Sequence, residues 1–437
     1  MVDLAGAGVR VVALTWVDNA GLTRVKAVPT ARLDAATRWG VGMSPVFDVY
    51  LVDDSITSSE HVGGPVGDLR LFPDLDRLTV LHAMPGWAWA PVDRRTQDGR
   101  PYAACQRTFA RSAVARAAEA GVDLTMAFEV EWFVGDDEGD GTKPACRGPA
   151  YGMTRMVELS DYVADLLEAL DAQGVPVDQV HPEYAPGQME LSVAATDPVG
   201  AADRQVLVRQ TIRAVCHSYG LRPSFAPVVV AGQVGNGGHL HFSAWSEGTN
   251  LFAGGDGPHG MTGRGEAVLA GLLDHLPALC AIGAPSVPSY LRLVPQRWAG
   301  AFRCWGRENR EAALRFVTGT QGSEATAANA ELKCFDASAN PYLVVGAVAS
   351  VVASAVEGAR LPPEVPVDPA SLAAGDQPPR LPRSLTEATD ALEGDALLRQ
   401  ALGEALFSAF VAVRRAEVEL FAGQNDDEVV AATRWIH

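Results

Sequence analysis

The chain has 437 residues, and at about 150 residues per domain this length suggests two or three domains. Apolar residues make up 48% of the sequence, charged residues 20% and aromatic residues 7%, a composition that excludes a disordered or fibrous chain. Acidic residues outnumber basic residues 53 to 35, which gives a formal net charge of −18. This balance argues against nonspecific binding to nucleic acid, because such proteins carry a basic face.

Cysteine usage and hydropathy indicate the compartment. Six cysteines lie far apart and form no Cys-x-x-Cys pair, as expected of reduced thiols that serve as small apolar residues. The N-terminus shows no basic segment followed by an apolar stretch, so no secretory signal is expected. The longest uncharged apolar run, residues 343–356, is too short to cross a bilayer. We therefore expect a cytoplasmic protein with no membrane partner.

The first hundred residues are predicted to be mostly β. Two β-rich runs, residues 9–17 and 22–28, are separated by Asp18-Asn19-Ala20-Gly21, a combination typical of a hairpin. A second pair, residues 78–84 and 87–92, lies on either side of Pro85-Gly86. The stretch 53–68 is rich in Ser, Gly and Asp and is expected to be a loop.

Helices and strands alternate after residue 100, so we expect an α+β fold with domains at residues 1–100 and 101–437. Asp197-Pro198 and Asn340-Pro341 each predict a helix start, and Ser160 is expected to cap a third helix. The remaining elements are predicted in chain order as a helix at 105–120, a strand at 124–134, a helix at 160–173, strands at 180–184 and 188–194, a helix from 198 to about 220, a strand at 239–245, and helices after 340 interrupted by the Pro-rich stretch 361–382.

Glu129 and Glu131 are the first candidate site residues. On a strand, positions i and i+2 face the same side, so the two carboxylates project together. Adjacent like charges raise each other's pKa unless a cation lies between them. The alternative interpretation is a solvated strand face.

Two further clusters follow along the chain. Residues 181–190, His-Pro-Glu-Tyr-Ala-Pro-Gly-Gln-Met-Glu, place two carboxylates around a Pro-Gly turn, which could equally be an exposed hairpin. Residues 235–243, Gly-Asn-Gly-Gly-His-Leu-His-Phe-Ser, place His239, His241 and Ser243 on one strand face after glycines that permit close backbone approach to a ligand. This pattern favours a phosphate or metal site, although neither a P-loop nor a zincin motif is present.

The last two clusters are basic and mixed. Residues 303–310 are Arg-Cys-Trp-Gly-Arg-Glu-Asn-Arg, with Arg315 five residues later, and arginines at this density favour an anionic partner such as phosphate. Salt bridges to the many acids are the alternative. Residues 330–343 contain Glu331 and Lys333 on one strand face, before Asn340-Pro341 opens a helix.

The order of these five clusters resembles the motif series of the glutamine synthetase family. Glu-x-Glu is followed by Glu-x6-Glu with a Pro-Gly-Gln turn, Gly-x-Gly-x-His-x-His-x-Ser, Asn-Arg-x4-Arg and Glu-x-Lys-x2-Asp-x3-Asn-Pro-Tyr. Phe47-Asp48 and residues 68–74 resemble the N-terminal domain of that family. The resemblance covers nearly the whole chain. It implies a small β-grasp-like N-terminal domain and a large glutamine-synthetase-type catalytic domain around a curved antiparallel sheet.

The resemblance also implies a binding role for particular residues. ATP and Mg²⁺ or Mn²⁺ are the implied co-substrate and cofactors, and carboxylates with one imidazole suit these hard cations. One metal ion would be held by Glu131, Glu183 and Glu190, and a second by Glu129, His239 and Glu331. Phosphates and nucleotide would be held by His241, Ser243, Arg310 and Arg315, with Arg310 also catalytic. Glutamate would be held by Gly235, Arg292 and Lys333.

Departures from the family pattern point to an altered amine site. Trp298 stands where ammonia-using members have a glutamate that closes over ammonium, and an indole can instead contact a carbon-bearing amine or its cationic group. Asp48 is followed by Val49-Tyr50 rather than Gly-Ser-Ser, and it could serve as a base toward the amine. Lys333 replaces an arginine, and Val234 replaces an asparagine that contacts the amino-acid substrate.

These features resemble the branch of the family that attaches glutamate to organic amines. We therefore expect an ATP-dependent glutamate–amine ligase that activates the γ-carboxylate of glutamate as an acyl phosphate and joins it to a small amine of the ethanolamine or polyamine type. The alternatives are an ammonium-using glutamine synthetase, a catalytically silent homologue, and a ligase for a different carboxylic acid. The resemblance further implies a homododecamer in which the N-terminal domain, with Asp48, completes the site of a neighbouring subunit.

Overall fold

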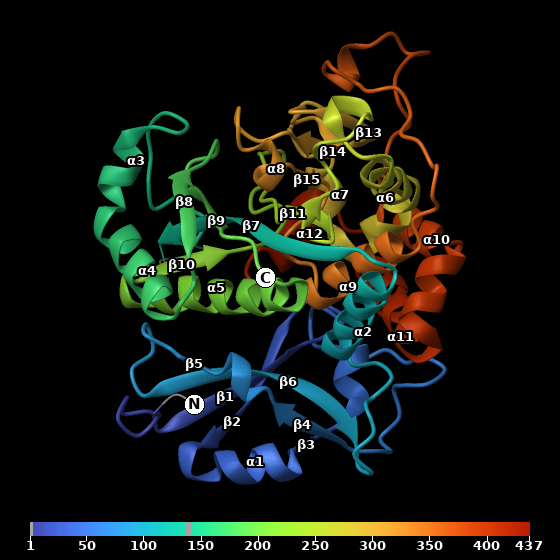
Figure 1. Cartoon of the computed structure of the whole chain (residues 1–437). Helices are drawn as coiled ribbons and strands as arrows, with labels where there is room; N and C mark the ends of the chain where they lie inside the picture. The colour runs from blue at the N-terminus through green and yellow to red at the C-terminus, as the bar shows by residue number, and fades with distance from the viewer. Residues whose placement is uncertain (1–2, 137–140) are drawn as a thin grey trace.

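A six-stranded sheet occupies the N-terminal part of the chain in the computed structural model, which describes residues 3–136 and 141–437 (Figure 1). Its strand order is β2-β1-β6-β4-β3, with β5 paired to β6. The pairs are antiparallel except for β1 and β6, which run parallel. The strands are β1 (Val11–Val17), β2 (Thr23–Pro29), β3 (Val41–Met43), β4 (Leu69–Pro73), β5 (Thr79–Val80) and β6 (Trp87–Thr96).

A nine-stranded sheet forms the centre of the rest of the molecule. Its strand order is β13-β14-β15-β11-β7-β9-β8, with β10 on β7 and β12 on β11. The pairs are antiparallel except for β13 and β14, which run parallel and depart from the fully antiparallel sheet expected. The strands are β7 (Asp123–Asp136), β8 (Val177–Pro182), β9 (Gln188–Val193), β10 (Leu221–Ser224), β11 (Leu240–Ser246), β12 (Thr249–Asn250), β13 (Phe302–Arg307), β14 (Ala312–Val317) and β15 (Asn329–Leu332).

Helices cover the second sheet and separate it from the first. Figure 1 shows α5 running beneath β7, between the two sheets, with α2 and α9 beside it. The α-helices are α1 (Leu33–Trp39), α2 (Gln106–Glu119), α3 (Met153–Glu158), α4 (Ser160–Ala172), α5 (Pro198–Ser218), α6 (Gly263–Gly283), α7 (Ser289–Arg292), α8 (Glu324–Ala327), α9 (Pro341–Ala353), α10 (Leu385–Glu393), α11 (Ala396–Leu420) and α12 (Asp426–Thr433). Short 3₁₀ turns are η1 (Thr30–Arg32), η2 (Pro45–Val49), η3 (Leu75–Arg77), η4 (Pro258–Gly260) and η5 (Pro369–Ser371).

Local signals located most helix starts correctly. The side chain of Asp197 accepts a hydrogen bond from the Gly200 amide at the start of α5, and Asn340 accepts from two amides at the start of α9. The cap expected at Ser160 was wrong, because α3 runs almost directly into α4 and the preceding Leu159 occupies the cap position without a side-chain hydrogen bond. The packing of two successive helices therefore overrode a local capping preference.

Strand predictions were less accurate where turns intervene. The strand expected over residues 78–84 is reduced to β5, because a turn begins at Leu81, whose amide bonds the carbonyl of Trp87. The strand expected at 239–245 begins one residue later, at Leu240. The hairpin of β1 and β2 and the loop at 53–68 are confirmed.

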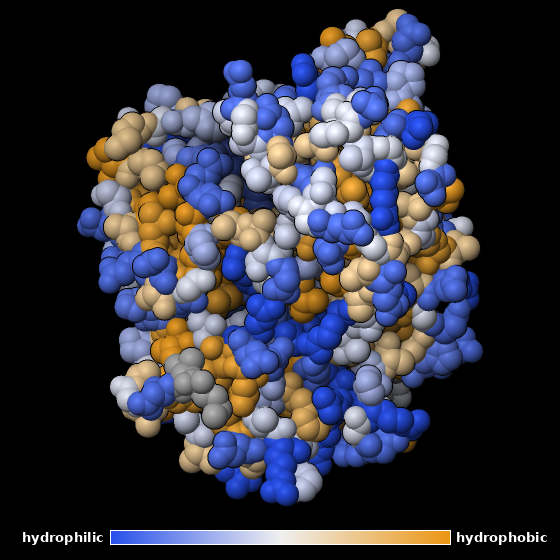
Figure 2. Space-filling view, viewed as in Figure 1, coloured by the Kyte–Doolittle hydropathy of each residue, from blue (hydrophilic) through white to orange (hydrophobic). Residues whose placement is uncertain are grey.

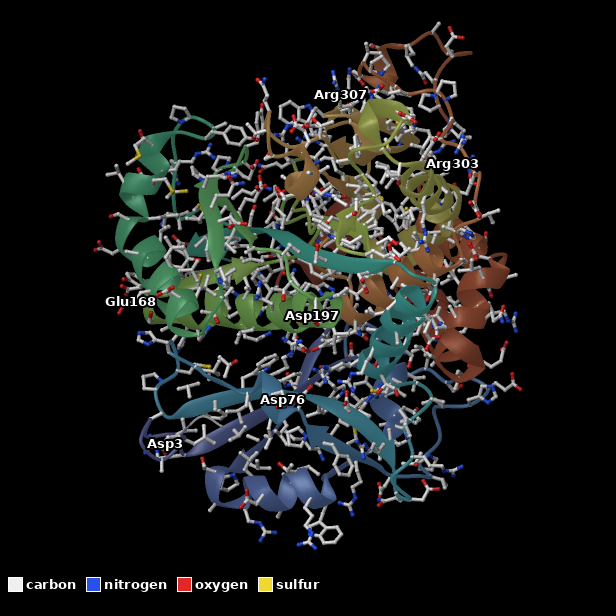
Figure 3. All side chains as sticks on the ribbon, viewed as in Figure 1. Asp3, Asp76, Glu168, Asp197, Arg303 and Arg307 are labelled. Atoms are coloured by element: carbon white, nitrogen blue, oxygen red, sulfur yellow. The ribbon has the colours of Figure 1, made fainter. Side chains whose placement is uncertain are left out.

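Charged side chains join the two sheets across their junction. Arg107 on α2 contacts Asp74, Asp93 and Asp203 at 2.7, 3.0 and 2.8 Å. Asp197, at the start of α5, is reached from the other side by Arg77, at 2.7 Å. Figure 3 shows Asp197 and Asp76 on the two sides of this junction. The N-terminal sheet is therefore joined to helices α2 and α5 by ion pairs as well as by packing.

Two helices, α6 and α11, are long and apolar enough to cross a membrane by length and composition alone. Most of the α6 residues are buried in the main core, and α11 contributes Leu398, Leu406 and Phe410 to it. Apolar core helices meet the same length and hydropathy criteria as membrane spans. The face of the molecule shown in Figure 2 mixes hydrophilic and hydrophobic residues. A recess in this face lies between the region of β8 and the region of α8.

Candidate active site

Strand register brings the predicted acidic residues together. Glu129 and Glu131 project from the same face of β7, and Glu131 is directly opposite Glu190 on β9. On the other side, Glu331 on β15 is directly opposite His241 on β11, which in turn pairs with β7. Since residues opposite one another across a sheet have adjacent side chains, four strands place these carboxylates and imidazoles in one cage.

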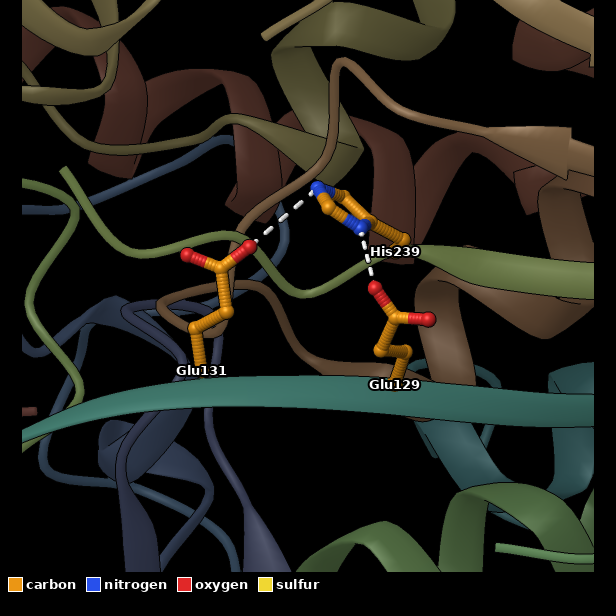
Figure 4. Close-up of side chains that lie close together, drawn as sticks. All are labelled: Glu129, Glu131 and His239. Atoms are coloured by element: carbon orange, nitrogen blue, oxygen red, sulfur yellow. Dashed lines mark hydrogen bonds and ion pairs between the residues drawn. The ribbon is translucent and has the colours of Figure 1, made fainter. Parts of the chain in front are cut away.

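Glu129 and His239 form the centre of this cage (Figure 4). His239 Nδ1 lies 2.9 Å from Glu129 Oε1 and 3.3 Å from Glu331 Oε1, and His239 Nε2 lies 3.8 Å from Glu131 Oε1. Burial alone would raise the pKa of Glu129, but its hydrogen bond with His239 and the nearby imidazole of His241 hold that pKa well below its usual value. Glu129 therefore stays ionised and is available to a cation.

Glu131 is held by groups that its own strand does not supply. Its Oε2 accepts hydrogen bonds from Gln188 Nε2 at 2.8 Å and from the Gly237 amide at 2.9 Å. Burial raises the pKa of Glu131. A Cβ on Gly237 would lie 2.3 Å from His239 Nε2, so only glycine allows the backbone to approach both side chains this closely.

The turn between β8 and β9 supplies a third group. His181 Nε2 lies 3.1 Å from Glu190 Oε1, and His181 Nδ1 lies 3.6 Å from Glu183 Oε1. Burial, with neighbouring carboxylates, raises the pKa of Glu190 to about 8, and the hydrogen bond to Glu190 raises the pKa of His181 to about 9. Tyr151 donates to Glu183 Oε2 at 2.8 Å. These contacts orient both carboxylates of the turn.

His241 and Ser243 lie on the same strand but in different surroundings. His241 Nε2 is 3.4 Å from Glu129 Oε2 and 3.9 Å from Glu331 Oε1. Although burial opposes it, these carboxylates raise the pKa of His241 to about 9. Ser243 instead shares hydrogen bonds with Thr125 at 2.6 Å and Trp245 at 2.8 Å. The structure thus brings His241 into the acidic cage and places Ser243 beside it, against β7.

Glu331 is neutralised by Arg315 of the predicted phosphate cluster and by Lys333, which was predicted to bind glutamate. Arg315 Nη1 lies 2.9 Å from Glu331 Oε2, and Lys333 Nζ lies 3.0 Å from Glu331 Oε1. Arg315 also contacts Glu308 at 2.9 Å. Arg310 is exposed on the turn between β13 and β14, and Figure 3 shows the neighbouring Arg307 at the outer edge of the molecule. Of the predicted phosphate cluster, Arg315 therefore contacts the cage, whereas Arg310 lies at the surface.

Arg292 borders the cage on the side predicted to bind glutamate. Its Nη2 lies 3.0 Å from His239 Nε2 and donates to the Lys333 carbonyl at 3.2 Å. Its buried Nη1 has no hydrogen-bond partner among the described residues, which leaves a cationic donor for a carboxylate. A Cβ on Gly235 would lie 2.0 Å from the Pro227 carbonyl oxygen and 3.2 Å from the Arg292 Cβ, so the backbone packs closely against Arg292 here, and the contact of Gly235 with glutamate stays a prediction.

Trp298 lies on the loop between α7 and β13. Its side chain is 57% exposed and its φ is 53°, a left-handed conformation that is uncommon outside glycine. The Trp298 amide donates to Glu311 Oε1 at 2.8 Å. Burial raises the pKa of Glu311 above its usual value. Hydrogen bonds from the Trp298 and Gln296 amides and the charge of Lys333 act in the opposite direction but do not cancel this effect. Trp298 is thus linked to the cage through Glu311 and Lys333.

Asp48 lies apart from these groups. It has no exposed surface and pairs with Arg94 at 2.7 Å, between the N-terminal sheet and α2. A general base must come within hydrogen-bond reach of the proton that it accepts, so this burial argues against the catalytic role expected for Asp48. Exposed acids on the loop that follows are Asp53, Asp54, Glu60 and Asp68.

The donor set fits divalent metal ions of the hard class. Among the described residues, three groups bring their ligand atoms within 4.8 Å of one another: Glu129, Glu131 and His239; Glu129, His241 and Glu331; and His181, Glu183 and Glu190. Oxygen ligands with a few imidazoles suit Mg²⁺ or Mn²⁺. The raised pKa of Glu190, caused by burial and by neighbouring carboxylates, is the electrostatic strain that a bound cation would relieve.

Four contributors to this site were not predicted. His181 and Gln188 stood inside a motif that was singled out, but only the β8–β9 register shows that they face Glu190 and Glu131. Tyr151 has no local sequence signal, because it reaches Glu183 from a segment 32 residues away. Glu311 follows the predicted phosphate cluster, yet nothing in the sequence indicates that it contacts the Trp298 loop.

Comparison with known proteins agrees with this arrangement. The glutamine synthetase catalytic domain matches residues 103–430. A gamma-glutamylpolyamine synthetase, GlnA3, from Streptomyces coelicolor is 58% identical over 99% of this chain and 95% of its own length. A gamma-glutamylanilide synthase from Acinetobacter sp. is 27% identical over 100% and 93%.

Solved structures extend the similarity to the fold. A glutamine synthase homologue superposes with a TM-score of 0.88 and 31% identity, over 98% of this chain and 99% of that chain. GmaS in complex with ADP superposes with a TM-score of 0.85 and 28% identity, over 98% of both chains. The α+β fold expected from the sequence is confirmed, and the chain belongs to the glutamine synthetase family.

Proposed function

We propose that this protein is an ATP-dependent ligase that joins the γ-carboxylate of glutamate to a primary amine of a polyamine or a similar small organic amine. Membership of the family makes it a ligase that forms carbon–nitrogen bonds. The relative that is 58% identical is a gamma-glutamylpolyamine synthetase, which favours a polyamine over ethanolamine within the amine class.

The observation that carries this proposal is the exposed indole of Trp298 beside an intact acidic cage. All six predicted metal ligands lie within the three clusters of the cage. The family position that would close over ammonium holds Trp298, which is 57% exposed. An indole cannot accept the proton of ammonium, but its face attracts organic cations and its edge packs against carbon chains.

Each predicted residue has a proposed task. Glu129, His239 and Glu331 would hold one Mg²⁺ or Mn²⁺ ion, and Glu131, Glu183 and Glu190 another, with His181 and His241 as additional imidazoles within reach. When bound, these ions would supply positive charge that offsets the negative charge of the phosphate groups. Arg310, Arg315, His241 and Ser243 would contact ATP, Arg292, Lys333 and Gly235 would contact glutamate, and Trp298 would contact the amine.

Two bond changes follow from the proposed substrates. The γ-phosphoryl group of ATP passes to a glutamate γ-carboxylate oxygen, which gives ADP and an acyl phosphate. The amine nitrogen then forms a bond to the carbonyl carbon of the γ-carboxyl group, the bond from that carbon to the phosphate oxygen breaks, and the nitrogen loses a proton as phosphate leaves. Arg292 and Lys333 are buried cations and would orient the glutamate carboxylates throughout.

A panel of amines tests the proposal directly. Purified protein would receive ATP, Mg²⁺, glutamate and, in turn, ammonium, ethanolamine, a diamine and longer polyamines, and phosphate release would be measured. We expect release with organic amines and mass-spectrometric detection of the γ-glutamyl amide. Release with ammonium alone would overturn the proposal in favour of a glutamine synthetase. Replacing glutamate by other carboxylic acids in the same assay would test the acid substrate.

Assembly and location form a separate part of the proposal. By its family, the chain would form a cytoplasmic homododecamer, in which exposed acids of the 53–68 loop, rather than Asp48, would be available to a neighbouring subunit. Light scattering of the purified protein would measure its mass. A monomer that retains full amine-dependent turnover would contradict the assembly without affecting the proposed reaction.

A further inference from the structure

The loop that presents Trp298 has an unfavourable backbone. Gln296 has a φ of 62° and Trp298 a φ of 53°, although neither is glycine. Non-glycine residues in the left-handed region are strained and persist only where surrounding contacts impose them. Some contact must therefore hold this loop in place.

Glu311 provides that contact from the turn before β14. Its Oε1 accepts the Trp298 amide at 2.8 Å, and the Gln296 amide faces the same carboxylate. The turn that carries Glu311 is itself fixed, because the Glu311 amide donates to Asn309 Oδ1 at 3.0 Å. One carboxylate thus faces the amides of both strained residues.

The position of Glu311 is unusual for a merely structural acid. The side chain is 5% exposed, and its Oε2 has no hydrogen-bond partner within the described part of the chain. Burying a carboxylate oxygen without a partner is costly. An apolar residue would avoid that cost if packing were the only requirement.

We propose that Glu311 is a positioning residue for the amine half of the reaction: it anchors the strained loop that presents Trp298 to the amine substrate. This inference rests on the proposed function. It predicts that Glu311 affects the apparent affinity for the amine more than that for ATP or glutamate, because its hydrogen bond goes to the Trp298 amide, whereas its neighbour Arg310, assigned to ATP, is exposed on the same turn.

Steady-state kinetics of Glu311→Ala and Glu311→Gln test the inference. In Glu311→Ala we expect the KM for an accepted amine to rise about tenfold or more, since a charge-assisted hydrogen bond is lost, while the KM values for ATP and glutamate stay within about twofold, which is a difference below 0.5 kcal/mol. Glu311→Gln keeps one acceptor oxygen and should recover most of the amine affinity.

Glu364→Ala is a matched control. Glu364 Oε1 accepts the Arg307 amide at 2.9 Å, so it is also a carboxylate that holds a backbone N–H near β13, but it does not contact the Trp298 loop. We expect its amine KM to remain that of the wild type. An unchanged amine KM in Glu311→Ala, a parallel rise of all three KM values, or equal effects of Ala and Gln would each overturn the inference.

Hydrogen exchange gives a readout that does not need activity. Peptides covering residues 294–300 should exchange faster in Glu311→Ala than in the wild type and in Glu364→Ala, while the β7 peptides stay unchanged. Equal exchange in the three proteins would overturn the inference. Failure of the proposed function would appear separately, as a wild-type protein with no amine-dependent turnover whose 294–300 loop is still loosened by Glu311→Ala.

Discussion

The acidic cage depends on a residue with no side chain. The Gly237 amide binds Glu131, and a Cβ at this position would lie 2.3 Å from His239 Nε2 and 2.9 Å from both Glu131 Oε1 and Arg292 Nη2. The side chains of His239, Glu131 and Arg292 therefore all lie close to the backbone at Gly237. An added methyl group would therefore force the ends of these side chains to move.

Gly237→Ala is expected to lower amine-dependent phosphate release about 100-fold or more, because displacement of reacting groups by about 1 Å is enough for such a loss. Far-UV circular dichroism should show a folded protein. Gly375→Ala is the matched control, because a Cβ there meets no atom within 4 Å. Normal turnover in a folded Gly237→Ala protein would contradict the proposed cage.

Helix packing at the scale of elements includes one titratable link. His275 on α6 lies 2.6 Å from Asp395, whose side chain also caps α11 by accepting the Leu398 amide. The hydrogen bond to Asp395 is the main cause that raises the pKa of His275. The pair thus couples the last long helix to the core helix α6.

This link should make stability depend on pH. Because the pKa of His275 is raised in the folded protein, its contribution is fully present below the unfolded value of about 6.5 and is lost as pH rises through the folded pKa. His275→Asn should therefore lower the melting temperature more at pH 6 than at pH 9, by an amount equivalent to about 1 kcal/mol or less for this partly exposed pair.

Asp395→Asn provides the comparison. Asparagine retains the helix cap but removes the charge, so the pH-dependent loss should match that of His275→Asn. Thermal scans at both pH values would measure it. If the melting temperature of either variant were lowered by the same amount at pH 6 and at pH 9, the effect would come from packing and not from the charged pair.

At the scale of the whole molecule, a buried ion pair between Arg94 and Asp48 lies at the junction of the two sheets. Arg94 contacts Asp48 at 2.7 Å and also donates to the Ala104 carbonyl at 2.6 Å, and Gln106 links the same cluster to Asn19 at 2.8 Å. Neither charge is more than 1% exposed. The pair therefore joins η2 and β6 to the start of α2.

Asp48→Ala should lower the stability of the protein by about 3–5 kcal/mol, because it leaves the Arg94 charge buried and unpaired. Asp54→Ala is the control: Asp54 pairs with Arg24 at 2.7 Å but is 67% exposed, so its loss should cost about 1 kcal/mol or less. Denaturant unfolding would compare the two. Undiminished stability with lost turnover in Asp48→Ala would instead restore its proposed role as a base.

Parts of the fold and of the candidate site could be predicted from the sequence because their signals are local. Alternation along residues 124–134 correctly placed Glu129 and Glu131 on one strand face, and Asp197-Pro198 and Asn340-Pro341 correctly marked helix starts. The series of short motifs identified the family, and from it the set of acidic residues that the sheet brings together.

Only the tertiary structure decided which groups surround those residues. Strand register paired Glu131 with Glu190 and His241 with Glu331, packing at the junction enclosed Asp48, and the turn before β14 brought Glu311 to the Trp298 loop. The physical reason is that a side chain's periodicity is encoded over a few residues, whereas its burial and partners depend on contacts between distant segments, which no local pattern specifies.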